Sequence, residues 1–241
     1  RNITRDEATK WLEGKGIKSR KGTFIESALY TDSLASVIKD GLFEQEFLAV
    51  QDESSQLAGF AVQPRDGDYI LDACAGLGTK TRQIRECARR AFIVAADIGM
   101  KRLRQVPKDS HPVRADIMRN PFKENIFDSI LLDAPCSSLG IIRKHPEIKW
   151  RRKEKDIGAF GNYQLDLLRA LWNNLKTGGV MVYSVCSFEP EETVRVIERF
   201  KEERKFVLEN PLPFLFNKEY FLSLPHQTGM DGYFIAKLRK L

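Results

Sequence analysis

Two cysteines stand in similar positions, each just after a run of apolar residues. Cys136 lies in the sequence DAPCSS, which follows FDSILL, and Cys186 follows VMVYSV. A thiolate is a nucleophile, and neighbouring groups favour it by lowering the pKa of the thiol. Asp133, three residues before Cys136, supplies a carboxyl group that can stabilise charge or exchange a proton with a reacting group. These residues predict nucleophilic catalysis combined with proton transfer.

The other two cysteines, Cys74 and Cys87, are interpreted as small buried hydrophobic side chains. The four cysteines are widely spaced, without a C-x-x-C or H-x-x-x-H pattern, so we predict no metal site. This cysteine usage is typical of reduced thiols in the cytoplasm. No apolar run approaches the roughly 20 residues that cross a membrane. We therefore expect a cytoplasmic protein, monomeric and without a membrane partner.

A glycine-rich turn, LDACAGLGTKT, joins an apolar segment to a segment of helical character. Gly76 and Gly78 allow the backbone to approach a ligand closely, although such a turn also serves to pack a strand against a helix. The nicotinamide-binding pattern G-x-G-x-x-G is incomplete, because Thr81 stands at the third glycine position. The phosphate-binding pattern G-x-x-x-x-G-K-[ST] also fails, because Thr79 separates Gly78 from Lys80.

Two acids further along the chain favour a third ligand, S-adenosyl-L-methionine (SAM). SAM carries no phosphate, so its loop does not have to surround a pyrophosphate. Asp97 ends the next strand-like segment, where a carboxylate can bind ribose hydroxyls. Asp116 lies near the end of the strand-like segment after that and is placed to meet the adenine amino group. Together with the glycine turn, these acids predict a nucleoside-type cofactor.

Segments typical of strands and of helices alternate from about residue 67 onward. This alternation predicts an α/β fold with a mostly parallel sheet and helices on both faces. Ligands of such sheets bind beyond the carboxyl ends of the strands, where the glycine turn, the acids and both cysteines fall. The expected strands are 68–76, 92–98, 112–117, 127–134, 180–187 and 232–240, and the expected helices are 80–91, 100–109, 163–176 and 189–203.

The N-terminal part of the chain has a different character. Thr4 and Glu7 form a capping-box pattern that predicts a helix start, and residues 23–32 predict a strand. We expect residues 1–45 to be part of a small α+β appendage whose beginning is missing from this sequence. Residues 46–241 are expected to form the main domain.

A basic segment, IIRKHPEIKWRRKEK, follows Cys136, in a chain whose formal net charge is +6. From composition alone it is equally compatible with a solvated surface. Cations beside an aromatic residue such as Trp150 are typical of surfaces that bind nucleic acid. The candidates for RNA contacts are Arg143, Lys144, His145, Lys149, Arg151 and Arg152.

One reaction would use the thiols, the carboxyl group and SAM together. The C5 carbon of cytosine is too weak a nucleophile to accept a methyl group unaided. Addition of a thiolate at C6 turns C5 into an enamine carbon, and a base must later remove the C5 proton so that the thiolate can leave. The reaction needs an activated thiol, a group that stabilises charge at N3 and a proton acceptor. Asp133 suits the second role, and the two cysteines suit the first and third.

The chain resembles the RNA (cytosine-5-)methyltransferases of the Sun/Fmu/NOL1/NOP2 group. The resemblance covers nearly the whole chain and rests on VQDESSQLA, LDACAGLGTKT, AADI, VRAD, LLDAPCSSLG, RKHPEIKW, YSVCSFEPEE and HQTGMDGYFIAKL, in this order. It implies a Rossmann-like SAM-dependent methyltransferase fold with a mostly parallel seven-stranded sheet. It also implies that the chain forms 5-methylcytosine in RNA through a covalent cysteine adduct.

The same resemblance assigns roles to individual residues. It implies that Cys186 is the nucleophile and that Cys136 assists product release as a base, with Asp133 acting at N3 and Lys80 beside it. DNA cytosine-5 methyltransferases use the proline-cysteine motif for the attack, so Cys136 remains the alternative nucleophile. The implied SAM contacts are Cys74, Ala75, Gly76, Leu77, Gly78, Thr79, Lys80, Asp97, Asp116 and Asp133.

Two positions differ from the usual family motifs, and one segment resembles a particular branch of the family. The family loop usually reads A-P-G-G-K-T where this chain has GLGTKT, and Val185 replaces the usual threonine before the nucleophile. LGIIRKHPEIKW most resembles the bacterial branch that modifies 16S rRNA and usually carries an N-terminal RNA-binding domain. We therefore expect rRNA as the partner and an RNA-binding role for the 1–45 appendage. The alternatives are a tRNA methyltransferase of the same family, a non-catalytic ribosome assembly factor and a nicotinamide-dependent oxidoreductase.

Overall fold

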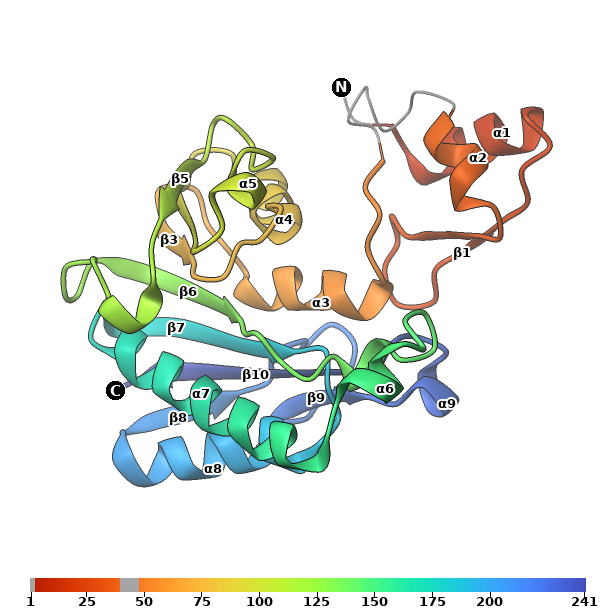
Figure 1. Ribbon diagram of the computed structural model, residues 1–241. Helices are drawn as coiled ribbons and strands as arrows, with labels where there is room; N and C mark the ends of the chain where they lie inside the picture. The colour runs from red at the N-terminus through yellow and green to blue at the C-terminus, as the bar shows by residue number, and fades with distance from the viewer. Residues whose placement is uncertain (1–2, 40–47) are drawn as a thin grey trace. The chain divides into compact units, whose positions relative to one another are not determined.

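The computed structural model describes residues 3–39 and 48–241 (Figure 1). The chain divides into two compact units, Arg1–Glu53 and Ser54–Leu241. The boundary expected between residues 45 and 46 lies outside the described residues. Each unit is described by itself below.

The first unit is a small α+β structure, as the sequence predicts. The Thr4 capping box is present, because Thr4 Oγ1 accepts from Glu7 N and Glu7 Oε2 accepts from Thr4 N. The expected strand 23–32 is mostly a turn, because Glu53 Oε1 accepts the amides of Phe24 and Ile25 at 2.5 and 2.6 Å in place of a neighbouring strand. The described elements are α1 (Arg5–Gly14), β1 (Ser19–Lys21), β2 (Leu29–Thr31) and α2 (Leu34–Lys39), with β1 and β2 antiparallel.

The second unit is built on a mostly parallel sheet with the order β5-β4-β3-β6-β7-β10-β8, which confirms the predicted fold class. Strand β10 runs antiparallel to β7, β8 and β9, and the other described pairs of this sheet are parallel. An eighth strand, β9, pairs with the first half of β10 while β8 pairs with the second half. The strands are β3 (Tyr69–Asp72), β4 (Phe92–Asp97), β5 (His111–Arg114), β6 (Phe127–Asp133), β7 (Leu175–Val185), β8 (Phe206–Glu209), β9 (Tyr220–Ser223) and β10 (Tyr233–Lys240).

Both faces of this sheet are covered, which explains its continuous apolar runs. Successive side chains of a strand point to opposite faces, yet Ile130 and Leu131 of β6 are both 0% exposed. Helices α7 and α8 lie together on one face (Figure 1), where Leu168 and Phe200 join the core around Ile130. The helices are α3 (Glu53–Val62), α4 (Thr79–Cys87), α5 (Met100–Leu103), α6 (Ile148–Arg151), α7 (Glu154–Trp172), α8 (Val194–Glu203) and α9 (Pro225–Thr228).

Several elements differ from the sequence expectations. The helix expected over 189–203 begins instead as a 3₁₀ turn, Pro190–Glu192, and α8 starts only at Val194. Strands β8 and β9 are not among the expected strands. Cys87 is exposed rather than buried, because Ile84 and Ala88 occupy the inward positions at the end of α4. The helix expected over 163–176 begins earlier, at Glu154, and ends at Trp172, and the helix expected over 100–109 is helical only over Met100–Leu103. The core strands lie where the apolar pattern predicts them.

Candidate active site

The carboxyl ends of the parallel strands meet at one edge of the sheet. β3, β4 and β6 end at Asp72, Asp97 and Asp133, and Cys186 directly follows β7. Parallel register forces these ends together, so residues more than 100 positions apart in the chain come within reach of one another.

The glycine turn between β3 and α4 takes the tight shape that its sequence predicts. Gly76 and Gly78 have φ angles of +57° and +79°, a region that other residues adopt at a cost. A Cβ atom on Gly78 would lie 2.8 Å from Val106 Cα, so only glycine fits there. Leu77, between the two glycines, is half-exposed, and Thr79 begins α4.

Asp97 lies against this turn. Its Oδ2 accepts from Gly76 N at 2.9 Å, and its Oδ1 accepts from Gly99 N and from Arg102 Nη2, both at 2.6 Å. The Asp97 side chain is 6% exposed, whereas that of Arg102 is 51% exposed. A ribose hydroxyl bound at Oδ1 would therefore share this oxygen with the amide of Gly99 and with the half-exposed Arg102.

Asp72 is a site residue that the sequence reasoning did not single out. It is 1% exposed, and Thr81 Oγ1 donates to its Oδ2 at 2.7 Å. Its other oxygen, Oδ1, is buried and has no hydrogen-bond partner among the described residues. Burial raises the pKa of this carboxyl group to about 7. A buried acceptor without a donor is costly, and the position beside the glycine turn suits a ligand that supplies the donor.

The remaining predicted cofactor residues lie in the glycine turn or after β5. Asp116 follows β5 and accepts from Met118 N at 3.0 Å, with its side chain 37% exposed. Cys74 is partly buried, and burial raises the pKa of its thiol. Ala75 is tied to β4, because its N–H donates to Ala96 O at 2.9 Å.

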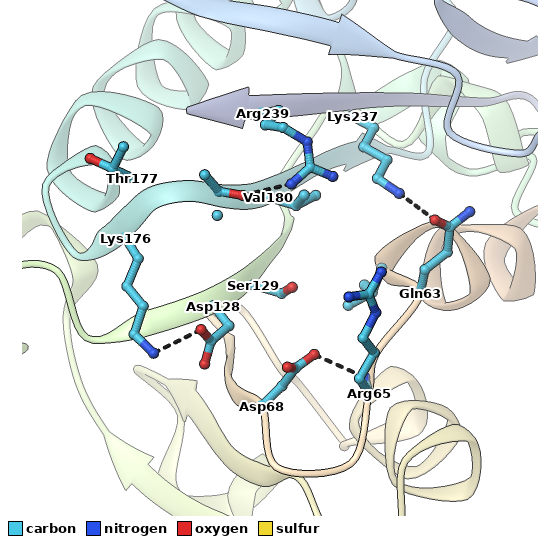
Figure 2. A pocket seen from close by; sticks show the side chains of 13 residues that line it. Gln63, Arg65, Asp68, Asp128, Ser129, Lys176, Thr177, Val180, Lys237 and Arg239 are labelled. Atoms are coloured by element: carbon cyan, nitrogen blue, oxygen red, sulfur yellow. Dashed lines mark hydrogen bonds and ion pairs between the residues drawn. The ribbon is translucent and has the colours of Figure 1, made fainter. Parts of the chain in front are cut away.

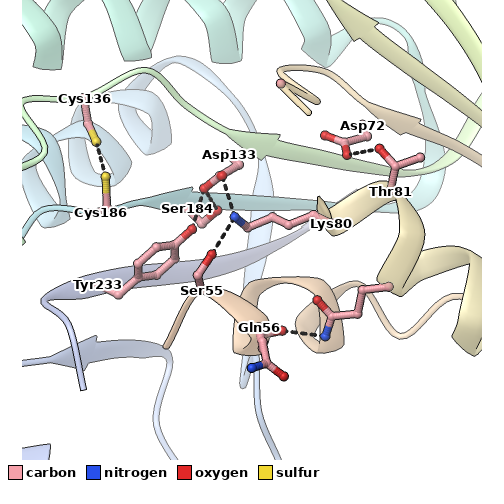
Figure 3. A network of polar contacts seen from close by, with 12 residues as sticks. Ser55, Gln56, Asp72, Lys80, Thr81, Asp133, Cys136, Ser184, Cys186 and Tyr233 are labelled. Atoms are coloured by element: carbon pink, nitrogen blue, oxygen red, sulfur yellow. Dashed lines mark hydrogen bonds and ion pairs between the residues drawn. The ribbon is translucent and has the colours of Figure 1, made fainter. Parts of the chain in front are cut away.

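Asp133 is the centre of a polar network (Figure 3). Lys80 Nζ donates to its Oδ2 at 2.7 Å, while Ser184 Oγ and Tyr233 OH donate to its Oδ1 at 2.8 and 2.5 Å. Lys80 also donates to Ser55 Oγ at 2.8 Å. The predicted pair of Asp133 and Lys80 is thus in contact, and the hydroxyls that fix it come from β7, β10 and α3. These three hydroxyl groups were not predicted, since no local pattern marks them.

Cys136 and Cys186 face each other across the ends of β6 and β7, with their sulfur atoms 3.0 Å apart (Figure 3). The Ser138 hydroxyl lies 3.7 Å from Cys186 Sγ, and Ser138 has a φ of +65°, a strained value for a residue with a side chain. Gly140 N donates to Cys186 O at 3.0 Å, which links the two loops again.

The two thiols differ in acidity. The hydrogen bond from Cys136, together with Ser138 and Lys80, lowers the pKa of Cys186 against the opposing effects of burial and Asp133. The same contact with Cys186, followed by burial and the charge of Glu192, raises the pKa of Cys136. The Cys186 thiol is therefore the more acidic of the two, which favours Cys136 as the donor in the contact between them.

The predicted RNA-contact residues divide into two groups. Arg143 Nε and Lys144 Nζ bind the buried Asp231 at 2.8 and 2.7 Å, and Arg152 Nε donates to Ser137 O at 2.9 Å, so these cations have structural partners. The others lie on an exposed surface around Trp150, which is 84% exposed. In this second group are His145, Lys149 and Arg151.

A polar cavity of about 270 Å³ lies elsewhere in the second unit (Figure 2). It is lined by the beginnings of β6 and β7 and the end of β10, at the edge of the sheet opposite the cysteines. Lys237, Arg239 and Lys176 line it, paired with Gln63, Glu209 and Asp128 respectively. It is therefore not the cofactor site.

Neither a membrane span nor a metal cluster is found in the part of the chain that the structure describes. None of its helices is long and apolar enough to cross a bilayer. Within residues 3–39 and 48–241, no three side chains of the metal-binding types gather.

The sheet order and the shared edge of strand ends define a Rossmann-like fold of the kind found in SAM-dependent methyltransferases. Two solved structures from Pyrococcus horikoshii have this fold. A methyltransferase homolog protein has a TM-score of 0.79 and 26% identity, covering 99% of this chain and 83% of its own. The NSun6 protein, solved with SFG, has a TM-score of 0.83 and 21% identity, covering 99% of this chain and 88% of its own. This second similarity concerns the fold alone.

The sequence comparisons identify the family. The model for 16S rRNA methyltransferase RsmB/F matches residues 59–239, and the chain belongs to this family. It is 35% identical over 249 residues to the ribosomal RNA small subunit methyltransferase B of Serratia proteamaculans, covering 99% of this chain and 57% of the relative. The chain spans about half the length of the curated relatives it matches. The resemblance inferred from the motifs is confirmed, and family and fold support SAM as the cofactor.

Proposed function

We propose that this chain is the catalytic part of a SAM-dependent RNA methyltransferase that forms 5-methylcytosine in small-subunit rRNA. The observation that carries the proposal is the contact of two thiols, 3.0 Å apart, beside a carboxylate held by a lysine. This set supplies the nucleophile, the proton acceptor and the charged group that cytosine methylation needs. The name of the Serratia relative supports small-subunit rRNA as the substrate.

The strand ends on the glycine-turn side fit SAM. Asp72 Oδ1 lacks a donor within the described chain, and the ammonium group of SAM can supply one. Asp97 offers its carboxylate to the ribose hydroxyls, and Asp116 offers its own to the adenine amino group. When bound, SAM supplies an electrophilic methyl group.

The acidity of the thiols supports Cys186 as the nucleophile. Its pKa is lowered, so its thiolate is available to form a bond to C6 of the target cytosine. The electrons of the C5–C6 double bond move toward N3, where the positive charge of Lys80, held in place by Asp133, can stabilise the added negative charge. C5 thereby becomes the nucleophile for the methyl group.

Cys136 is placed to complete the cycle. After methylation it acts as a thiolate, having lost its own proton to solvent, and takes the proton from C5. The electrons of that C–H bond restore the C5–C6 double bond while the Cys186–C6 bond breaks. Its raised pKa makes it a better proton acceptor than Cys186 once it is ionised.

Covalent trapping tests this assignment. Wild type, Cys136→Ala and Cys186→Ala are incubated with SAM and unmodified small-subunit rRNA, then separated on denaturing gels. We expect Cys136→Ala to accumulate a protein–RNA adduct and Cys186→Ala to form none. An adduct in Cys186→Ala that is missing from Cys136→Ala would reverse the roles. Parallel incubation with tRNA distinguishes the two RNA classes.

A further inference from the structure

Glu192 is a buried carboxylate with no role in the reaction described above. It ends the 3₁₀ turn Pro190–Glu192 and is 0% exposed. The sequence places it in a helix that begins with several acids, where a solvent-facing side chain would be expected. Burying a carboxylate is unfavourable unless hydrogen bonds replace its water, so the inward orientation requires compensating partners.

Those partners come from the two loops that carry the cysteines. Ser137 follows Cys136 directly; its N–H donates to Glu192 Oε1 at 2.7 Å, and its hydroxyl donates to Oε2. Ser187 follows Cys186 directly, and its hydroxyl donates to the same Oε2 at 2.7 Å. A single carboxylate thus connects the residues next to both sulfur atoms.

Helix α7 and strand β7 fix the carboxylate in turn. Gln164 Nε2 lies 3.1 Å from Glu192 Oε1 and 3.0 Å from Pro135 O, so it bonds both the carboxylate and the Cys136 loop. Tyr183 OH donates to Glu192 O at 2.6 Å. A Cβ on Gly161 of α7 would lie 2.1 Å from Glu191 O, which shows how closely the helix approaches this turn. Glu192 is therefore held in place by helix α7 and strand β7.

We propose that Glu192 is a positioning residue that holds the Cys136 and Cys186 loops together so that the two thiols stay in contact. The expected effect on methylation rests on the proposed function. The positioning effect itself concerns only the distance between the two sulfur atoms. The negative charge of Glu192 also contributes to the raised pKa of Cys136, so the same residue helps to keep the two thiols different in acidity. The Glu192 carboxylate accepts four hydrogen bonds, and none of them comes from either sulfur atom.

Thiol cross-linking measures the distance without any RNA. Diamide converts two thiols that can meet into a disulfide, and their two hydrogens and two electrons reduce its N=N bond to a hydrazine. The rate of Cys136–Cys186 cross-linking is followed by alkylation and mass spectrometry. Glu192→Ala should slow it by at least about tenfold, because a disulfide forms only between closely placed sulfur atoms.

Two other variants distinguish the hydrogen bonds of Glu192 from its charge, and both from the effect of any substitution in this turn. Glu192→Gln should cross-link within about threefold of wild type, since its amide oxygen can accept from Ser137 N and its NH₂ can donate to hydroxyls that rotate. The matched control is Glu191→Gln, whose carboxylate pairs with Arg195 on the surface of the same turn. It should behave as wild type.

The outcomes decide the proposal in either direction. Slower cross-linking in Glu192→Ala with an unchanged SAM affinity supports it, and cross-linking at the wild-type rate overturns it. If Glu192→Ala does not fold, Ser187→Ala, which breaks one link only, replaces it with the same two outcomes. In methylation assays Glu192→Ala should lower kcat about 100-fold with little change in KM for RNA. Wild type that cross-links but methylates no RNA would refute the proposed function and leave the positioning result intact.

Discussion

The two halves of the strand-end site differ in how their carboxyl groups are satisfied. On the β3–β4 side, Asp72 has a buried oxygen without a partner among the described residues, whereas Asp97 accepts from the amides of Gly76 and Gly99 and from the half-exposed Arg102. On the β6–β7 side, Asp133 accepts three side-chain hydrogen bonds and Glu192 accepts four hydrogen bonds. The β6–β7 half is saturated by the protein, while Asp72 in the other half retains an acceptor for a ligand.

This difference follows from what each half must do. Groups that act on a reacting base gain from being fixed beforehand, because no reorganisation is then needed during the reaction. A cofactor that exchanges after each turnover needs acceptors that become satisfied only when it binds. The comparison predicts that damage to the saturated half affects the chemical step, and damage to the other half affects cofactor affinity.

The largest effect is expected from Cys186→Ala. Removal of the nucleophile should lower methyl transfer by about a thousandfold or more, because the covalent route is lost. SAM affinity should stay within about twofold of wild type, since the thiol belongs to the saturated half. Methyl transfer from labelled SAM and calorimetric titration with SAM measure the two quantities. A large loss of SAM affinity would show that the halves are not separate.

A smaller effect, on the other half, is expected from Asp72→Asn. The change should weaken SAM binding about tenfold, because a charged hydrogen bond is replaced by a neutral one. In wild type the carboxyl group has a pKa near 7 before SAM binds. Affinity should therefore rise as the pH increases from about 5.5 to about 7, and this rise should disappear in the variant. Calorimetry across that pH range makes the measurement.

The same residue makes a prediction about stability. Because burial raises the pKa of Asp72 from 3.8 to about 7, the folded state binds the proton more tightly than the unfolded state. Its contribution is favourable below pH 3.8 and is lost as the pH rises toward 7. Asp72→Asn should remove this slope from the thermal unfolding midpoint. Asp66→Asn, which alters an exposed ion pair with Arg90, is the control and should preserve the slope.

The smallest effects concern the basic segment. Arg151→Ala should weaken RNA binding a fewfold and reduce the salt dependence by about one counterion, since an exposed cation contacts a phosphate at most once. Arg143→Ala should instead lower the unfolding midpoint, because it leaves the buried Asp231 with one fewer cation. Filter binding at several salt concentrations and thermal melts separate the two. Equal salt slopes for Arg151→Ala and wild type would remove Arg151 from the RNA surface.

Much of the fold could be predicted from local pattern. The apolar strands ending at Asp72, Asp97 and Asp133 are short and bounded by turn residues, so their positions follow from periodicity alone. The helix expected over 189–203 was wrong at its start, because the acidic residues that favour a first helical turn include Glu192, which tertiary partners draw inward. Strands β8 and β9 lack a clear pattern because they border the sheet.

The sequence by itself determined which groups are available for chemistry: two thiols, a row of strand-end acids, a glycine turn and a lysine. Their types and order also sufficed to indicate the family. Only the tertiary structure decided that the sulfur atoms are 3.0 Å apart, that Asp133 is held by Tyr233 and that Glu192 joins the cysteine loops. The physical reason is that most of these contacts link residues 50 or more positions apart, and their partners are set by strand register and by the need to satisfy buried polar groups.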